Sequence, residues 1–272
     1  MRLALLVTLV TLAMGLAPRA GAQVPEVEIA AVPEHTTVAP GGSFRVAVRL
    51  RIPDGWHMAW TNAGQTGLPT TLAWTAPRGV GAGVTEWPYP EREEADGLVS
   101  HIYRGEVVIV TAFPPDSTAR GNVAVRHGEF RWGLCRRVCV PQTRTIEVSV
   151  PVGRGPVEVS PGWRGLEADL EALPVQSAGL RLRGVVRGDS VRLTIAGPAV
   201  SGMQATTATF FPLESGAAVV APIRATRGMA TVMLPIRVLR SGSRRLAGIL
   251  VADPGWLASP RRRALAVTTV VE

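Results

Sequence analysis

The chain has 272 residues, of which 46% are apolar and 18% are charged, so it can form a packed core and is not a disordered protein. The formal net charge is +8, and all of the positive charge is on Arg, because the chain contains no Lys. The 29 Gly and 22 Pro residues, without a Gly-X-Y repeat, exclude a collagen-like chain and indicate many turns between short strands.

Segment 1–22 has the pattern of a cleaved secretory signal. Arg2 supplies a positive charge, an apolar run follows from Leu3 to Leu16, and Ala20-Gly21-Ala22 has the A-x-A form of a cleavage site. The run is shorter than the roughly 20 residues that cross a bilayer, and no later stretch reaches that length. We therefore expect a mature chain that is exported, periplasmic and soluble, without a transmembrane segment. Export argues against nucleic acid as a partner.

Strand patterns dominate the first half of the chain. Apolar and polar residues alternate over 44–52 and again over 146–152, which predicts strands with one buried and one solvent face. The continuous apolar run Val107–Val110 is typical of a strand that is covered on both faces.

One amphipathic helix is predicted after the glycine-rich break near Gly153. Ser160 can cap it and Pro161 suits its first turn. Trp163, Leu166, Leu170 and Leu173 would share one face before Pro174 ends the helix.

The second half of the chain returns to strand patterns. They cover 179–186, 190–196, 204–211, 229–238, 244–251 and 264–271. Evenly spaced short strands with turn signals predict β-sandwiches. The sequence thus predicts two all-β domains, 23–153 and 154–272, joined by a short helical connector.

Cys135 and Cys139 are the two cysteines of the chain and the candidate functional residues. On one extended strand, residues four apart lie about 13 Å apart at ~3.3 Å per residue, whereas a disulfide needs Cα atoms within about 7 Å. A bond between these cysteines therefore requires a turn at a hairpin end or a bend. Such a position leaves the sulfurs near a loop, where a thiolate of another protein could reach them.

Three interpretations of this pair are open at the level of sequence. A structural disulfide that closes a loop of about five residues would stabilise the fold by roughly 2 kcal/mol, less than a long-loop bridge. A redox-active pair is favoured by the loop position and by Arg136 and Arg137, whose charge favours thiolate. Cys135 has the opposite parity to the core-facing Trp132 and Leu134, which favours it as the first attacker.

The third interpretation is a soft-metal site, in which the two thiolates bind Cu(I), alone or with a methionine such as Met58. A structural zinc site needs four ligands, and no nearby motif completes such a set with the two cysteines. The histidines are scattered, and each is expected to be structural or on the surface: His35, His57, His101 and His127. Apart from this copper alternative at Cys135 and Cys139, we expect no metal and no cofactor.

Other conspicuous residues have simple structural interpretations. The core or sheet-face aromatics are expected to include Trp56, Trp60, Trp74, Trp87 and Trp132. The segment Asn62–Gly67 is interpreted as a glycine-containing turn, and such loops often carry binding contacts.

Several stretches that follow one another across residues 30–152 carry a family resemblance. They are Asp54–Gly64 (DGWHMAWTNAG), Thr66–Thr70 (TGLPT), Glu86–Pro90 (EWPYP), Ile102–Val107 (IYRGEV), and Trp132–Cys135 followed by Cys139–Pro141. With them, the sequence resembles the periplasmic amino-terminal domain family of the thiol:disulfide interchange protein DsbD, in the branch associated with suppression of copper sensitivity. Residues 154–272 resemble the weaker companion β-domain of that branch.

The resemblance implies an immunoglobulin-like sandwich in which Cys135 and Cys139 match the family's redox pair and cycle between dithiol and disulfide. In the family, a membrane-embedded thiol reductase donates the electrons. Periplasmic thioredoxin-like or disulfide isomerase proteins, or the cytochrome c maturation route, accept them. The family pattern supports the second cysteine, Cys139, as first attacker as well as Cys135.

Two departures from the family pattern matter. The chain has neither a multi-span membrane region nor a thioredoxin-like C-x-x-C motif, so we expect a stand-alone protein that needs a separate reductase. The family's cap loop over the cysteines carries aromatics, whereas Glu93–His101 has only the imidazole of His101. Leu98 is a candidate replacement, and an acidic loop at this place would raise the thiol pKa values.

The leading hypothesis is a periplasmic thiol–disulfide interchange protein, a protein-disulfide reductase component, that relays electrons through Cys135 and Cys139 to envelope proteins. Cytochrome c biogenesis and copper tolerance are the processes that the resemblance implies. The alternatives are a non-catalytic envelope binding protein with a structural disulfide, and a Cu(I)-handling protein.

Overall fold

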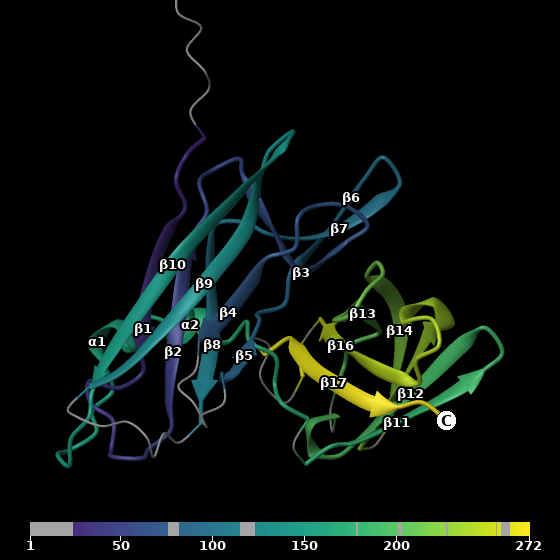
Figure 1. The fold of residues 1–272 in the computed structure, drawn as a ribbon. Coiled ribbons are helices and arrows are strands. Elements are labelled where there is room, and N and C mark those ends of the chain that lie inside the picture. The colour runs from purple at the N-terminus through teal and green to yellow at the C-terminus, as the bar shows by residue number, and fades with distance from the viewer. Residues whose placement is uncertain are drawn as a thin grey trace, which may run out of the picture.

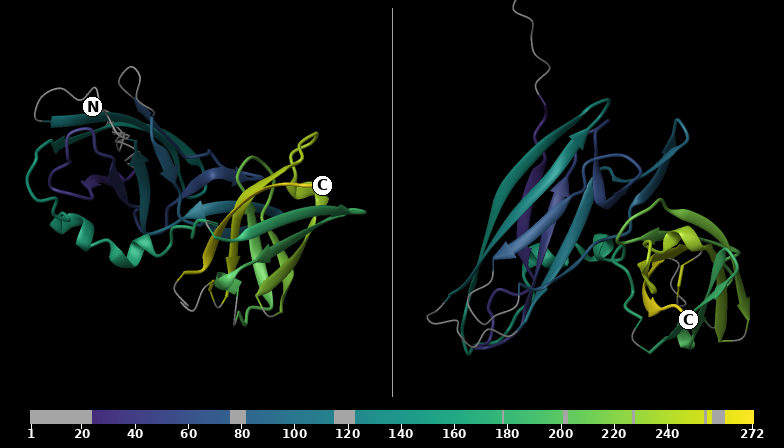
Figure 2. Two further views of the ribbon diagram at one scale, coloured as in Figure 1. Left: turned by 90° about the horizontal axis from the view of Figure 1, so that it is seen from below. Right: turned by 45° about the vertical axis from the view of Figure 1, so that its right-hand side comes forward.

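Two lobes follow one another along the chain, an N-terminal lobe (residues 24–152) and a C-terminal lobe (residues 175–272), with a helical segment between them (Figures 1 and 2). The computed structural model describes residues 24–75, 82–114, 123–177, 179–200, 203–226, 228–253, 255–256 and 262–272. The expected signal segment 1–22 lies outside the described residues. Strands make up most of both lobes, which confirms the all-β prediction.

The N-terminal lobe is a sandwich of two sheets. The first sheet has the order β1-β2-β8-β5, formed by Glu28–Pro33, Phe44–Arg51, Glu106–Phe113 and Val84–Glu86. The second has the order β10-β9-β3-β7-β6, formed by Cys139–Pro151, Val123–Cys135, His57–Gly64, Leu98–Tyr103 and Glu91–Ala95. A further strand, β4 (Thr71–Thr75), pairs with β9 beyond the end of β3. The inner faces of the two sheets enclose one hydrophobic core.

The burial of β2 and β8 follows from their sequences. In β2, Val46, Val48 and Leu50 are buried in the sandwich core, as the alternation predicts. In β8, the run Val107–Val110 is buried on both faces, which confirms the prediction from its unbroken apolar sequence. Its outer face is covered by the helical segment, because Val108 and Val110 form a second cluster with Trp163.

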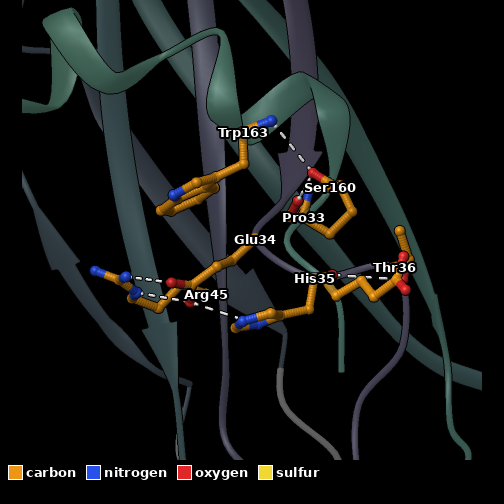
Figure 3. Close-up of polar contacts among 8 residues, drawn as sticks. Pro33, Glu34, His35, Thr36, Arg45, Ser160 and Trp163 are labelled. Atoms are coloured by element: carbon orange, nitrogen blue, oxygen red, sulfur yellow. Dashed lines mark hydrogen bonds and ion pairs between the residues drawn. The ribbon is translucent and has the colours of Figure 1, made fainter. Parts of the chain in front are cut away.

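The helical segment consists of two short helices, α1 (Pro161–Arg164) and α2 (Glu167–Leu170), rather than the single helix that the sequence predicts. Two glycines, Gly162 and Gly165, lower helix propensity within this stretch. The predicted cap is confirmed, since the Ser160 hydroxyl accepts a hydrogen bond from the Trp163 amide at 3.2 Å. As Figure 3 shows, the same hydroxyl donates to the Pro33 carbonyl at 2.6 Å and ties the helix to the end of β1.

An ion pair completes this attachment below the helix. Arg45 Nε donates to the Glu34 carboxylate at 2.8 Å, and its guanidinium lies 5.1 Å from the centroid of the Trp163 ring (Figure 3). The Glu34 hydrogen bond is the main cause that raises the pKa of Arg45. The helical segment therefore packs on the first sheet and is not a free linker between the lobes.

The C-terminal lobe is one seven-stranded antiparallel sheet in the order β11-β12-β15-β14-β13-β16-β17. Its strands are Arg181–Arg187, Ser190–Ala196, Met229–Pro235, Val219–Thr226, Thr207–Pro212, Arg245–Ala252 and Ala264–Val270, with short 3₁₀ helices at Pro198–Val200 (η1) and Ile236–Val238 (η2). The sheet curls until its first and last strands meet at a parallel bridge between Gly184 and Val271. Its inner face encloses a second core. The sequence predicts these strands apart from β14.

Side chains of the two lobes pack against one another. Phe211 and Ile249 of the C-terminal lobe belong to the same core cluster as Trp60 of the N-terminal lobe. The rings of Trp60 and Phe211 lie 6.2 Å apart, edge to face. Where the C-terminal lobe begins, Val175 donates its amide to the Ala264 carbonyl at 2.8 Å and so binds to β17.

Candidate redox site

The cysteine pair lies at the closed end of the long β9–β10 hairpin, which Figure 1 shows rising from the N-terminal lobe. Cys135 ends β9, Cys139 begins β10, and the two are directly opposite in the antiparallel register. Their Cα atoms are 4.0 Å apart and their sulfurs form a disulfide of 2.03 Å. The turn that the spacing of the cysteines requires is therefore present, formed by the three residues between them.

The two sulfurs have different environments. Cys135 is only 3% exposed, whereas Cys139 is half-buried and follows an exposed turn. In that turn Arg136 and Arg137 are exposed, and Val138 is 74% exposed. A partner would thus meet Cys139 first. The expectation that outward parity makes Cys135 accessible is wrong, because parity fixes the side of the sheet but not what covers it.

The loop between β3 and β4 packs on the outer face of β9 close to Cys135. On the outer face of β9, Glu129 and Arg131 are exposed, but Gly133 and Cys135 are buried. A Cβ placed on Gly133 would lie 2.8 Å from the Cβ of Leu68, so Leu68 rests directly on the Gly133 backbone, two residues from Cys135. Leu68 is not among the residues that the sequence predicts for this site. The signal that could have found it is a glycine inside a strand, which marks close approach of another segment.

His57 is the second neighbour of Cys135 that the sequence analysis did not identify. It is directly opposite Cys135 in the pairing of β3 with β9, and directly opposite residues of an antiparallel pair project to the same face. Burial lowers the pKa of His57; Glu93 acts in the opposite direction and Arg104 reinforces the decrease. Close to neutral pH this favours an uncharged imidazole beside the sulfurs.

The acidic stretch Glu93–His101 forms the hairpin of β6 and β7, and its charges are paired. Arg104 donates to Glu91 at 2.9 Å and also bonds Glu93, while Arg92 donates to Glu94 at 2.7 Å. These pairs offset the negative charge that the sequence alone places near the thiols. Leu98, the expected cap residue, lies 44% exposed next to the hairpin turn, and it is Leu68 that packs against β9.

The other candidates are distributed over the fold. His35 lies near Glu34 and His127 near Glu147, while His101 is fully buried between the lobes. Met58 is directly opposite Leu134 on the core face, so it points away from the outer face that carries Cys135, and it cannot join the sulfurs in a copper site. Within the described ranges, no three His, Cys, Asp or Glu side chains gather into a metal-binding group.

The tryptophans occupy the positions that were expected of them. Trp60, Trp74 and Trp132 are buried in the core of the N-terminal lobe, and Trp56 and Trp87 pack against it partly buried. The core prediction for these aromatics is confirmed.

A comparison with protein families identifies the N-terminal lobe. The model for the N-terminal part of the thiol:disulfide interchange protein DsbD matches residues 26–151, which include both cysteines. These residues form a DsbD N-terminal-like domain. The resemblance found in the sequence is thereby confirmed, together with the immunoglobulin-like sandwich and the assignment of a thiol–disulfide interchange domain.

Solved structures extend the likeness to the DsbD N-terminal-like domain and the C-terminal lobe together. The N-terminal periplasmic domain of ScsB from Proteus mirabilis matches with a TM-score of 0.58 at 15% identity, over 90% of this chain and 93% of that one, so both lobes belong to the shared fold. The DsbD N-terminal domain of Neisseria meningitidis, in complex with the PilB N-terminal domain, matches at 19% identity over 48% of this chain and 88% of that one, with a TM-score of 0.25. A comparison with curated protein sequences finds no match.

Among the residues that the structure describes, no helix combines the length and the apolar character needed to cross a bilayer.

Proposed function

We propose that the protein is a periplasmic thiol–disulfide interchange protein that relays electrons through Cys135 and Cys139. The observation that carries the proposal is the disulfide at the closed end of the β9–β10 hairpin, with one cysteine sheltered and the other beside an exposed turn. The match of residues 26–151 to the DsbD N-terminal family supports the same chemistry.

The proposed reaction has two displacement steps. In the reduced protein, the Cys139 thiolate attacks a disulfide sulfur of the acceptor, and the acceptor's other sulfur leaves as a thiolate. The Cys135 thiolate then attacks Cys139 Sγ, re-forms the internal disulfide and releases the acceptor's second thiolate. The acceptor gains two electrons and takes up two protons from water. A thiol donor reverses these steps and returns two electrons to the pair.

The environments of the two sulfurs support Cys139 as the first attacker. It is the more exposed, and the positive charges of Arg136 and Arg137 in the adjoining turn favour a thiolate over a thiol. Cys135 stays sheltered under Leu68 until the mixed disulfide has formed, which suits a resolving role. This assignment replaces the preference for Cys135 that its outward parity suggested.

The partners follow from the family as part of the proposal. A membrane-embedded thiol reductase would supply electrons, and periplasmic thioredoxin-like or disulfide isomerase proteins would accept them, in cytochrome c maturation or copper tolerance. Segment 1–22 would direct export. Residues 23–153 and 154–272 would be the two domains of the exported chain.

A redox titration of the folded protein tests the proposal. An exchanging pair should have a reduction potential above about −300 mV, whereas a structural disulfide lies below that value. The Cys135→Ser variant should accumulate a mixed disulfide with a thioredoxin-like protein, because Cys139 can attack but nothing resolves the product. The Cys139→Ser variant is the matched control and should trap little. A bond that a strong reductant cleaves only after denaturation would leave a binding protein with a structural disulfide.

A further inference from the structure

We propose that the C-terminal lobe controls access to Cys135, and that Asn62 is the positioning residue through which it does so. Asn62 holds the β3–β4 loop, residues 65–70, so that Leu68 covers the sulfur. This inference rests on the exchange function proposed above and assigns a role to the lobe that carries no cysteine.

The proposed cover is a single leucine of the β3–β4 loop. Leu68 packs on the Gly133 backbone, and only a glycine leaves room for it there, since a Cβ would come within 2.8 Å. Leu68 is 39% exposed, so it forms a single layer between solvent and the outer face of β9. Displacing it would open the buried face that Gly133 and Cys135 share.

Both ends of the loop are held to neighbouring strands. At its far end, Thr70 is fully buried and its hydroxyl donates to the Ala59 carbonyl of β3. At its near end, Gln65 and Val99 exchange hydrogen bonds of 2.8 and 2.9 Å, which attach the loop to β7. Gly64 starts the loop in the left-handed region, at a φ of +83°, where a Cβ would lie 2.5 Å from the Val99 carbonyl oxygen.

The side chain of Asn62 is an anchor that joins both lobes. Asn62 is buried, and its Oδ1 accepts from the Gly64 amide at 3.0 Å and so fixes the start of the loop. Its Nδ2 donates to the carbonyls of Pro212 and Gly216 in the C-terminal lobe, at 2.7 and 3.1 Å. The carboxamide is fully satisfied only when the segment between β13 and β14 is docked against it.

His101 reinforces the anchor from β7. Its Nδ1 donates to the Asn62 carbonyl at 2.7 Å, and its Nε2 accepts from the Ala218 amide at 2.8 Å, which together assign the tautomer. The ring packs edge to face on Trp60 and on Phe211. The same short segment of the C-terminal lobe is therefore held at two buried points, and both lead to the residues that start the loop.

The test measures how fast dithiothreitol reduces the disulfide in the full mature chain. Asn62→Asp keeps the acceptor for Gly64 but replaces the two interlobe donors by a carboxylate that repels carbonyl oxygens. Leu68→Ala removes the cover directly. Each variant should be reduced about fivefold faster than the wild type, the factor that one net hydrogen bond represents. Leu98→Ala is the matched control, a similarly exposed leucine on the β6–β7 hairpin, and should react at the wild-type rate.

The double variant separates positioning from a general loss of stability. If Asn62 acts through the loop, Asn62→Asp combined with Leu68→Ala should react no faster than Leu68→Ala alone. Multiplicative rates, or an Asn62→Asp rate equal to that of the wild type, would overturn the inference. Urea unfolding of each variant shows whether the protein is folded under the assay conditions.

Two further measurements keep the inference open to refutation if Asn62→Asp fails to fold. Gly133→Ala places a Cβ against Leu68 and should accelerate reduction in the same way, without touching the interlobe contacts. Amide exchange in residues 65–70 should be faster when the loop is released. If the disulfide resists the reductant in the wild type but not in the Leu68 and Gly133 variants, the cover by Leu68 is supported and the proposed exchange function is contradicted. If the wild type reacts and no variant changes its rate, the cover fails and exchange stands.

Discussion

The two ends of β3 have opposite environments. At its first residue, His57 is half-buried beside the disulfide, with the charges of Glu93 and Arg104 close by. Near its last residue, Asn62 is buried between the lobes and each hydrogen-bonding group of its carboxamide has a neutral partner. The cysteine end of β3 thus lies where the side chains are partly exposed and charges can be solvated. The lobes dock at the other end, where water is excluded. One short strand connects the two.

The largest effect is expected at the interlobe junction. Phe211→Ala should lower the free energy of unfolding by about 3–5 kcal/mol, because the ring is buried against Trp60 and His101 and its loss leaves a cavity. Urea denaturation measures this. The control is Leu213→Ala, an exposed position two residues away, which should change stability by about 0.5 kcal/mol or less. Equal effects of the two variants would mean that the lobes are energetically independent.

The cysteine end should matter less for stability than for chemistry. Replacing both Cys135 and Cys139 by Ser should lower the free energy of unfolding by about 2 kcal/mol, the chain-entropy value for so short a loop. The wild-type protein unfolded under reducing conditions provides the matched comparison. A loss larger than that of Phe211→Ala would show that the disulfide is a main support of the fold and would remove the contrast between the two ends.

Acid should weaken the junction through His101. Burial lowers its pKa from 6.5; the hydrogen bond to the Asn62 carbonyl opposes this and Arg92, across the hairpin, adds to it. The unfolded chain therefore binds a proton near pH 6.5 that the folded chain does not, so stability is fully present above that pH and falls as the pH drops below it. Protonated Nε2 could no longer accept from Ala218. Urea midpoints between pH 7.5 and 5 measure the slope.

His57 contributes a slope of the same sign, so a variant is needed to assign the effect. His101→Gln should reduce the pH dependence and His57→Gln should leave most of it. The opposite order would place the proton-sensitive group at the cysteine end of β3.

The smallest effect is expected from the surface charges at the cysteine end. Arg104→Gln should raise the pKa of His57, because it removes a positive charge and frees Glu93, which favours the imidazolium. Titration of His57 by NMR measures the shift. Global stability should change by less than about 1 kcal/mol, as for other exposed ion pairs. Arg144→Gln, which breaks a pair with Glu26 elsewhere, should leave the His57 pKa unchanged.

Local patterns in the sequence predict much of the fold. The alternation in β2 predicts its one buried face, and the apolar run in β8 predicts a strand that is covered on both faces. β14 escapes prediction because Pro222 interrupts it. The strand pairs with β13 up to Pro222 and with β15 from Ile223 onward, so the missing amide falls where the strand changes neighbour.

The candidate site is predictable only in part, for a related reason. The spacing of Cys135 and Cys139 requires a turn, and the turn is present. The cover by Leu68 and the neighbour His57 depend on contacts across 65 and 78 residues of sequence, which no local pattern encodes. Loop-to-strand packing of this kind is a property of the folded chain.

The register of the β9–β10 hairpin has a kinetic consequence. β10 pairs with β9 along its whole length, from Cys139 to Pro151, so the backbone holds the two sulfurs opposite one another whether or not they are bonded. Each thiol then experiences the other at a high effective concentration, as groups on a rigid scaffold do. A mixed disulfide at Cys139 would therefore have a short lifetime, because Cys135 would attack it and release the partner soon after it forms.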